Sequence, residues 1–200
     1  LERCSAVAPR HGFRFKHKLY ALDSSFIERS LNVFPWATYQ TAKGAAKLHV
    51  GLDHDGYLPA FVSLTDGHTS DIAEARRLFL PRGSMVVCDK GYTDFAWYQT
   101  VLKQGVFFVT RARANARFEV LSQVAPHHDH VRFDQTVRMT GVKPRAIGLR
   151  PLRRVGWRDP ETAKAYVFLT NATHLAAQTI AAIYRARWQI ELFFKWLKQN

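Results

Sequence analysis

The sequence predicts an α/β fold in which helices cover a mixed β-sheet and a basic β-rich insertion interrupts the core. Short apolar runs typical of strands alternate with segments of helical periodicity, which indicates layers of helix on a sheet. Two early runs flank the hairpin turn sequence Asp53-His-Asp-Gly56, so their pairing is antiparallel, whereas crossovers through helices favour parallel pairing later. An arginine-rich stretch of alternating β-like runs precedes the last helix.

The first part of the chain supplies a strand, a hairpin and a helix. The first strand closes on Asp-Ser-Ser, and the helix follows the start signal Gly67-His-Thr-Ser. Pro35 argues against one continuous element in the ambiguous stretch 26–41. The expected elements are strands at 17–23, 47–52 and 57–64 and a helix at 71–80.

The second part alternates buried strands with helices. Thr93 can cap a helix that Gly105 ends, and Asn171-Ala-Thr precedes the last helix. The continuous apolar runs are typical of strands buried on both faces. The expected elements are strands at 84–88, 106–110 and 164–170, a helix at 94–104, and a last helix that includes 184–200.

The character of the chain changes at residue 111. Residues 111–158 contain 11 Arg and Lys against 3 acidic residues, a net charge of +8. A solvated face is the ordinary reading of such charge, but interleaved aromatic residues favour contact with DNA phosphates. The β-like runs lie at 118–122, 131–138 and 146–155. We therefore expect a linker at 1–15, a core formed by 16–110 and 164–200, and an insertion at 111–163.

The composition favours a polyanionic partner. The net charge is +13, which indicates nucleic acid first and an anionic membrane second. No run approaches 18 apolar residues, and no signal segment is visible. Cys88 lies in an apolar run far from Cys4, which is typical of a reduced thiol and an intracellular protein. The start at Leu1 and the stop inside a periodic helix indicate a piece of a longer protein.

Polar residues of the last helix gather on one face. At 100° per residue, Tyr184, Arg187, Glu191, Lys195 and Lys198 share an arc of about 80°, beside the apolar stripe. By itself this pattern is an ion-pair ladder on a solvated face, worth a few tenths of a kcal/mol per pair.

Three carboxylates are candidates for a metal site. Asp23 and Asp89 each follow a predicted strand, and parallel neighbours would place them at one edge of the sheet. Taken singly, each is more often a turn or cap residue. Together, such carboxylates repel each other unless a cation such as Mg²⁺ or Mn²⁺ compensates. Glu191 would supply a third ligand from the last helix, and Lys and Arg on its arc would hold phosphates.

These residues also form a known pattern. Asp23 and Asp89-Lys-Gly-Tyr92 after strands, followed by Tyr184-x2-Arg187-x3-Glu191-x6-Lys198, resemble the DDE transposases of bacterial insertion sequences. More narrowly, the pattern resembles the insertion-sequence-four family, whose signature is Y-x2-R-x3-E-x6-K. The segment from Lys43 to His49 is also similar. Lys90 differs from the arginine that is frequent in the family and lacks its bidentate fork.

The resemblance implies a ribonuclease H-like core, interrupted by the insertion before the last catalytic helix, that cuts the ends of a mobile element and joins them to target DNA. It implies that Asp23, Asp89 and Glu191 bind two Mg²⁺ ions, for which Mn²⁺ can substitute. It implies that Tyr184, Arg187 and Lys198 contact DNA near the cleaved end, and we add Lys195 from its place on the same arc. The implied partners are terminal inverted repeats, target DNA and a second copy in a synaptic dimer, in the nucleoid of a bacterial cytoplasm.

Other interpretations stay open at this point. The chain could be a catalytically inactive DNA-binding remnant, or a ribonuclease H-like nuclease of another type, although the spacing of Tyr184 and Lys198 around Glu191 argues against the latter. The run His127-His-Asp-His130 lacks zinc-type spacing and is expected to be a solvated loop.

Overall fold

The chain forms two compact units in a computed structural model that describes residues 7–28 and 45–199. The first unit consists of Leu1–Leu80 with Arg187–Asn200, and the second of Pro81–Ala186. The first six residues of the predicted linker, Cys4, the ambiguous stretch from 29 onward, and Lys43 and Gly44 lie outside the described residues.

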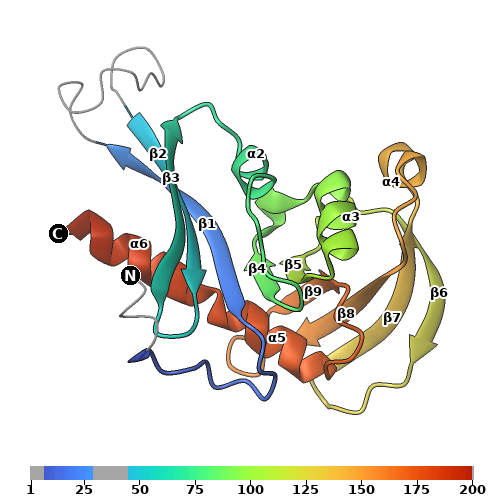
Figure 1. Cartoon of the computed structure of the whole chain (residues 1–200). Helices are drawn as coiled ribbons and strands as arrows, with labels where there is room; N and C mark the ends of the chain where they lie inside the picture. Colours follow the sequence, from blue (N-terminus) through green and yellow to red (C-terminus); the bar gives the residue numbers. More distant parts are fainter. Residues whose placement is uncertain (1–6, 29–44, 200) are drawn as a thin grey trace. The chain divides into compact units, whose positions relative to one another are not determined.

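The first unit is an antiparallel sheet with helices on it. Its strands lie in the order β3-β2-β1, and α6 passes behind them (Figure 1). The elements are β1 (Leu19–Glu28), β2 (Ala45–Asp53), β3 (Leu58–Asp66), α2 (Asp71–Ala75) and α6 (Trp188–Gln199). The helix α2 is shorter than the expected 71–80, with Ser70 as its N-cap.

The strand β1 differs from the prediction in a way that concerns the site. Asp23 does not end the strand but lies within it, opposite Val50 of β2. Ser24 and Ser25, which resemble turn residues in the sequence, continue the ladder opposite His49 and Leu48. Pairing with β2 satisfies the backbone of these serines, so tertiary context overrides their turn preference.

The hairpin between β2 and β3 confirms the turn expected at Asp53-His-Asp-Gly56. Gly56 and Tyr57 have φ angles of +73° and +55°, and the adjacent His54 is 2% exposed. The His54 ring packs edge-on against Tyr57, with 5.5 Å between ring centroids. The turn therefore buries a titratable side chain beside a strained backbone.

We expect His54 to make folding sensitive to acid. Its burial, with a smaller contribution from His11, lowers the pKa of His54 to about 4, against about 6.5 in an unfolded chain. As the pH falls from 6.5 towards 4, the unfolded chain binds more protons, so stability is lost, by about 2 kcal/mol at pH 5. Urea unfolding at pH 7.5 and pH 5 should show a smaller acid loss for His54→Gln than for the parent. Equal losses in the two proteins would contradict this assignment.

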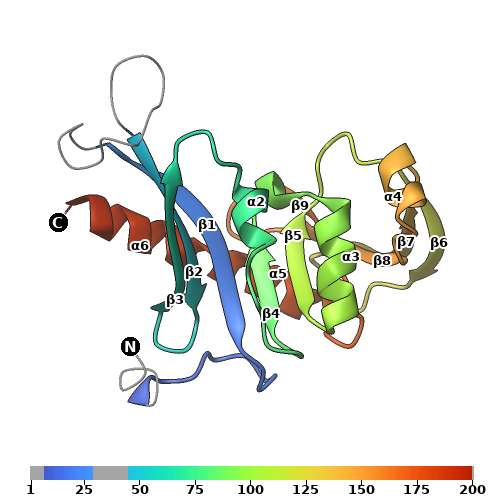
Figure 2. The same cartoon turned by 45° about the horizontal axis from the view of Figure 1, so that its top comes forward.

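The second unit is built on a six-stranded mixed sheet. The strand order is β4-β5-β9-β8-β7-β6, in which β4 and β5 are parallel and the other neighbours are antiparallel. Figure 2 shows α3 in front of β5 and α5 behind it. The strands are β4 (Met85–Cys88), β5 (Phe107–Arg111), β6 (Phe118–Val124), β7 (Val131–Met139), β8 (Leu152–Arg158) and β9 (Ala165–Thr170). The helices are η1 (Lys90–Tyr92), α3 (Phe95–Gln104), α4 (Val142–Ala146) and α5 (Ala177–Ala186).

The core of this unit confirms the buried strands. All four residues of β4 are buried, including Cys88. The ring of Tyr98 from α3 stacks on Phe108 of β5, with 4.5 Å between centroids. The N-cap of α3 is Asp94 rather than Thr93, because its carboxylate accepts from the Trp97 N–H.

The basic segment contains the expected strands and one unexpected helix. The strand expected at 146–155 begins later, at Leu152 of β8, because α4 occupies Val142–Ala146 and admits Pro144 in its first turn. β8 pairs with β9, so these strands continue the sheet that β5 belongs to. Whether 111–163 forms a separate domain stays a prediction.

The last helix is divided in two. α5 ends at Ala186 and α6 begins at Trp188, with Arg187 in a turn between them. The continuous helix expected over 184–200 is therefore wrong, although the Arg187 carbonyl still accepts from the Ile190 N–H. Among the described helices, none is long and apolar enough to cross a membrane.

Candidate active site

In the first unit, one arginine joins two of the three predicted carboxylates. Arg187 Nη1 lies 3.1 Å from Asp23 Oδ2, and Arg187 Nη2 donates to Glu191 Oε1. Asp23 comes from the middle of β1, and Glu191 from the first turn of α6. Residues 164 positions apart in the chain thus meet at one guanidinium.

The cluster is sheltered but reachable from solvent. The side chains of Arg187, Asp23 and Glu191 are 13%, 24% and 34% exposed. The N-terminal end of a helix carries a partial positive charge, which stabilises Glu191 in its first turn. The other oxygen of Asp23 accepts from the Ser24 N–H at 2.9 Å. Both acids therefore lie beside positively charged or hydrogen-bond-donating groups.

This arrangement suits a hard cation. Carboxylate oxygens are the ligands that Mg²⁺ and Mn²⁺ prefer, and a guanidinium between two of them shows that their charges converge on one cationic position. Within the described residues no group of three His, Cys, Asp or Glu side chains is close enough to hold a metal. That Asp23, Asp89 and Glu191 bind metal together therefore stays a prediction.

The opposite face of β1 carries a polar network that the sequence did not indicate. Ser24 donates its hydroxyl to Asp71 Oδ1 at 2.6 Å, and Lys47 Nζ lies 2.8 Å from the same oxygen. His49 Nδ1 is 3.4 Å away, and His49 Nε2 lies 2.9 Å from Thr65 Oγ1. Because side chains alternate along a strand, Asp23 faces α6 while Ser24 faces α2.

The charge state of this network follows from burial. Burial lowers the pKa of His49 more than the Asp71 carboxylate raises it, so the imidazole is neutral at pH 7. Lys47 then supplies the positive charge opposite Asp71. The network fixes the strand that carries Asp23. Period-two alternation from Asp23 to Ser24 and the helix cap before Asp71 are the sequence signals that could have located it.

The third predicted carboxylate, Asp89, lies in the second unit directly after β4. Its Oδ1 accepts from the Gly91 N–H at 2.6 Å and caps η1. Thr110 at the end of β5 donates its hydroxyl to the Asp89 carbonyl at 3.0 Å. The local role is thus the strand-end cap that the sequence also allowed. An open hollow beside it is lined by Asp89, Lys90, Gly91, Arg113, Ala114 and Asn115.

The predicted DNA-contact residues lie in different environments. Tyr184 on α5 is half-buried, with its ring 5.0 Å from that of Phe168, centroid to centroid. Lys195 and Lys198 are exposed on α6. Arg187 forms ion pairs with two acids, Asp23 and Glu191. The pair with Glu191 is the one that an ion-pair ladder along the last helix predicted.

Two histidines of the run pack on an aromatic side chain. His128 and His130 lie against Trp157, with ring centroids 5.4 Å and 5.6 Å away. The placement of the run between β6 and β7 agrees with the loop expected for His127-His-Asp-His130.

Comparison with known proteins connects these residues to one family. Residues 14–200 match the family described as "Transposase DDE domain". A Sinorhizobium fredii protein named as a transposase, y4zB, is 32% identical over 170 residues, covering 82% of this chain and 47% of that protein. A Geobacillus stearothermophilus protein named as the transposase of insertion sequence element IS5377 is 30% identical over 193 residues, covering 95% of this chain and 50% of that protein.

The fold has a solved counterpart. A cryo-EM structure of a piggyBac transposase synaptic complex with hairpin DNA is similar with a TM-score of 0.53 and 15% identity, covering 88% of this chain and 39% of that one. At this identity the similarity concerns the fold. The chain spans about half the length of the curated relatives it matches.

Proposed function

Because the chain belongs to the transposase DDE domain family, we propose that it is the catalytic region of an insertion-sequence transposase, which cleaves DNA at the ends of a mobile element and joins them to target DNA. One observation carries the proposal. Asp23 and Glu191, far apart in the chain, converge on a single cation, the Arg187 guanidinium.

The proposed metal site consists of Asp23, Asp89 and Glu191. Asp23 and Glu191 fit a divalent cation because both carboxylates already share a positive partner and remain accessible. In this proposal Asp89 is the third ligand. Its Oδ1 caps η1, so its Oδ2 would be the oxygen that binds the metal. When bound, two such ions would activate a water or 3′-hydroxyl and stabilise the leaving oxygen of a phosphodiester.

The side chains around the acids have their own tasks in the proposal. Arg187 bridges Asp23 and Glu191 in the free protein. Its guanidinium would be available to a DNA phosphate if a divalent cation held these carboxylates. Lys195 and Lys198, exposed on α6, hold the backbone of the cleaved end. Tyr184 contacts DNA through its hydroxyl edge, while its ring rests on Phe168.

The finer classification rests on the signature. Tyr184, Arg187, Glu191 and Lys198 match all four positions of the insertion-sequence-four signature, which supports that family and its ribonuclease H-like core. In this proposal the active form is a dimer that pairs two element ends in the bacterial cytoplasm. It binds terminal inverted repeats and target DNA.

The test is cleavage of supercoiled plasmid DNA. With Mg²⁺ or Mn²⁺ added, purified protein should convert a plasmid that carries element ends to nicked circles. EDTA should abolish the conversion, and Mn²⁺ should restore it. Binding of the same DNA without cleavage in either metal would instead favour an inactive DNA-binding remnant.

A further inference from the structure

The segment before β1, residues 7–17, forms a docked arm on the first unit. The arm lies against the hairpin turn, where a Cβ at Gly56 would come within 2.6 Å of the Ala8 Cβ. The His11 N–H donates to Asp55 Oδ1 at 2.8 Å. These contacts tie the arm to the turn over a separation of 44 residues.

The inner side of the arm is aromatic. The rings of Phe13 and Phe15 stack with 5.4 Å between centroids, and the His11 ring lies 4.7 Å from that of Phe15. His11 Nε2 is 2.8 Å from the His17 carbonyl oxygen, which folds the arm back on itself. His11, Phe13 and Phe15 are half-buried, so their rings pack together rather than extend into solvent.

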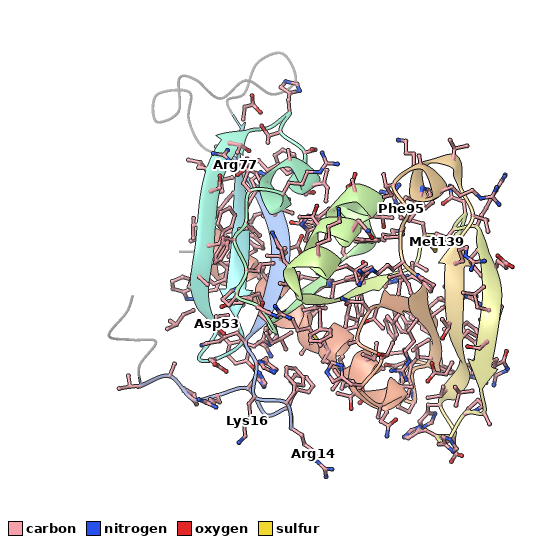
Figure 3. The ribbon with its side chains drawn as sticks, turned by 45° about the vertical axis from the view of Figure 1, so that its right-hand side comes forward. Arg14, Lys16, Asp53, Arg77, Phe95 and Met139 are labelled. Atoms are coloured by element: carbon pink, nitrogen blue, oxygen red, sulfur yellow. The ribbon has the colours of Figure 1, made fainter. Side chains whose placement is uncertain are left out.

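The outer side of the arm is cationic. Arg10, Arg14 and Lys16 alternate with the aromatic residues and are exposed. Figure 3 shows the labelled side chains of Arg14 and Lys16 pointing away from the ribbon. Among the described residues, none of these three cations has an ion-pair partner.

The nearby acids already have a cationic partner. Lys18 Nζ lies 2.7 Å from Asp53 Oδ2 and 2.8 Å from Asp55 Oδ2. Hydrogen bonds from Lys18 and from the His11 N–H, against the opposing effect of burial, lower the pKa of Asp55. Lys18 therefore pairs with the acids of the hairpin turn, whereas the charged groups of Arg10, Arg14 and Lys16 face outward.

We propose that this arm is a DNA-backbone contact that extends the binding surface beyond the active site. Three outward cations on a preordered segment suit phosphates, because the ordering cost is met during folding and not on binding. Residues 8–17 contain neither a helix nor a strand that could enter a groove, so the contact should be independent of sequence. The inference rests on the proposed function, since it presumes that the protein acts on DNA. Most of the arm precedes the family match, which begins at residue 14.

The first test neutralises the outer side of the arm. Fluorescence anisotropy of a 30-base-pair duplex, a length of about three helical turns, is measured across a NaCl series. Arg10→Ala/Arg14→Ala/Lys16→Ala should reduce the slope of log K against log salt by about 1 to 2.7, roughly 0.9 for each phosphate that the arm no longer neutralises. The matched control Arg82→Ala/Lys103→Ala/Lys164→Ala removes three exposed cations of the second unit and should change the slope less. An equal change of slope in both variants would overturn the proposal, because it would show that only the net charge of the protein matters.

The second test loosens the docking without changing any charge. Gly56→Val should drive the arm from the turn, since its Cβ meets Ala8, and should lower DNA affinity. Gly148→Val is its control, because Gly148 has a similar positive φ of +60° but no atom within 4 Å. Phe13→Ala/Phe15→Ala loosens the arm from its inner side if Gly56→Val fails to fold. Unchanged DNA affinity in a docking variant that folds would overturn the proposal that the docked arm binds DNA.

The possible outcomes distinguish failure of the arm proposal from failure of the proposed function. A parent protein that binds no DNA would refute the function itself. A parent that binds and nicks DNA while both arm variants keep its affinity and salt slope would refute only the arm. Vesicles with about 30% anionic lipid, which attract basic segments, serve as the competing surface. Arm-dependent binding to vesicles but not to DNA would likewise overturn the proposal.

Discussion

Replacement of Glu191 by Gln should abolish metal-dependent DNA cleavage, with a loss of at least about 100-fold in the nicking rate. The amide is nearly isosteric with the carboxylate but carries no charge. It should therefore weaken the binding of any divalent cation that Glu191 shares with Asp23. The fold should survive, because Arg187 keeps its ion pair with Asp23 at 3.1 Å. Asp23→Asn should cause a similar loss for the same reason.

The control for this variant is Glu161→Gln. Glu161 also pairs with an arginine, Arg185, but both side chains are 64% exposed and lie away from Asp23 in the chain. The Glu161→Gln variant should cut DNA at the parental rate. Binding of DNA by Glu191→Gln should persist, which distinguishes a lost reaction from a lost complex. If Glu191→Gln cuts as well as the parent, the metal-site assignment fails.

Replacement of Arg153 by Ala should destabilise the protein by about 3 kcal/mol, because it leaves a buried carboxylate without its partner. Arg153 on β8 binds Asp134 of β7 through two nitrogens, Nε at 2.8 Å and Nη2 at 2.6 Å. The two side chains are only 11% and 15% exposed. Arg153 Nη1 also donates to the Ala172 carbonyl at 3.2 Å, which ties the sheet to the segment before α5.

The matched control is Arg138→Ala in the same sheet. Arg138 pairs with Glu119, but these side chains are 52% and 56% exposed, so solvent screens the pair. Its loss should cost about 0.5 kcal/mol. Urea unfolding of the three proteins measures the difference. The double variant Arg153→Met/Asp134→Leu should recover much of the loss, since neither charge then remains buried. Equal effects of Arg153→Ala and Arg138→Ala would show that the buried pair has no special weight.

The sequence located much of the fold because local patterns decide it. The hairpin follows from the turn sequence ending in Gly56, whose φ of +73° favours glycine. The four-residue strand ending at Cys88 follows from its continuous apolar run, since strands buried on both faces need no polar alternation. The stop of α3 at Gly105, with a φ of +71°, follows in the same way.

Element boundaries failed where long-range pairing competes with local preference. Ser24 and Ser25 favour a turn by themselves, but β2 supplies hydrogen-bond partners that extend β1 to Glu28. The last helix has helical periodicity throughout 184–200, yet it divides at Arg187, where the side chain reaches Asp23 and Glu191. A hydrophobic pattern does not encode such a break.

By itself, the sequence determined which residues are candidates for the chemistry of this protein: the order of Asp23, Asp89 and Glu191 and the spacing of the last helix indicated the DDE transposase family that the comparison confirmed. Only the tertiary structure decided that Arg187 joins Asp23 to Glu191, and that Asp71 holds the other face of the strand beside them. The physical reason is that the charges meet in space. Asp23 on β1 and Arg187 in the turn before α6 are 164 residues apart, a separation that no local pattern records.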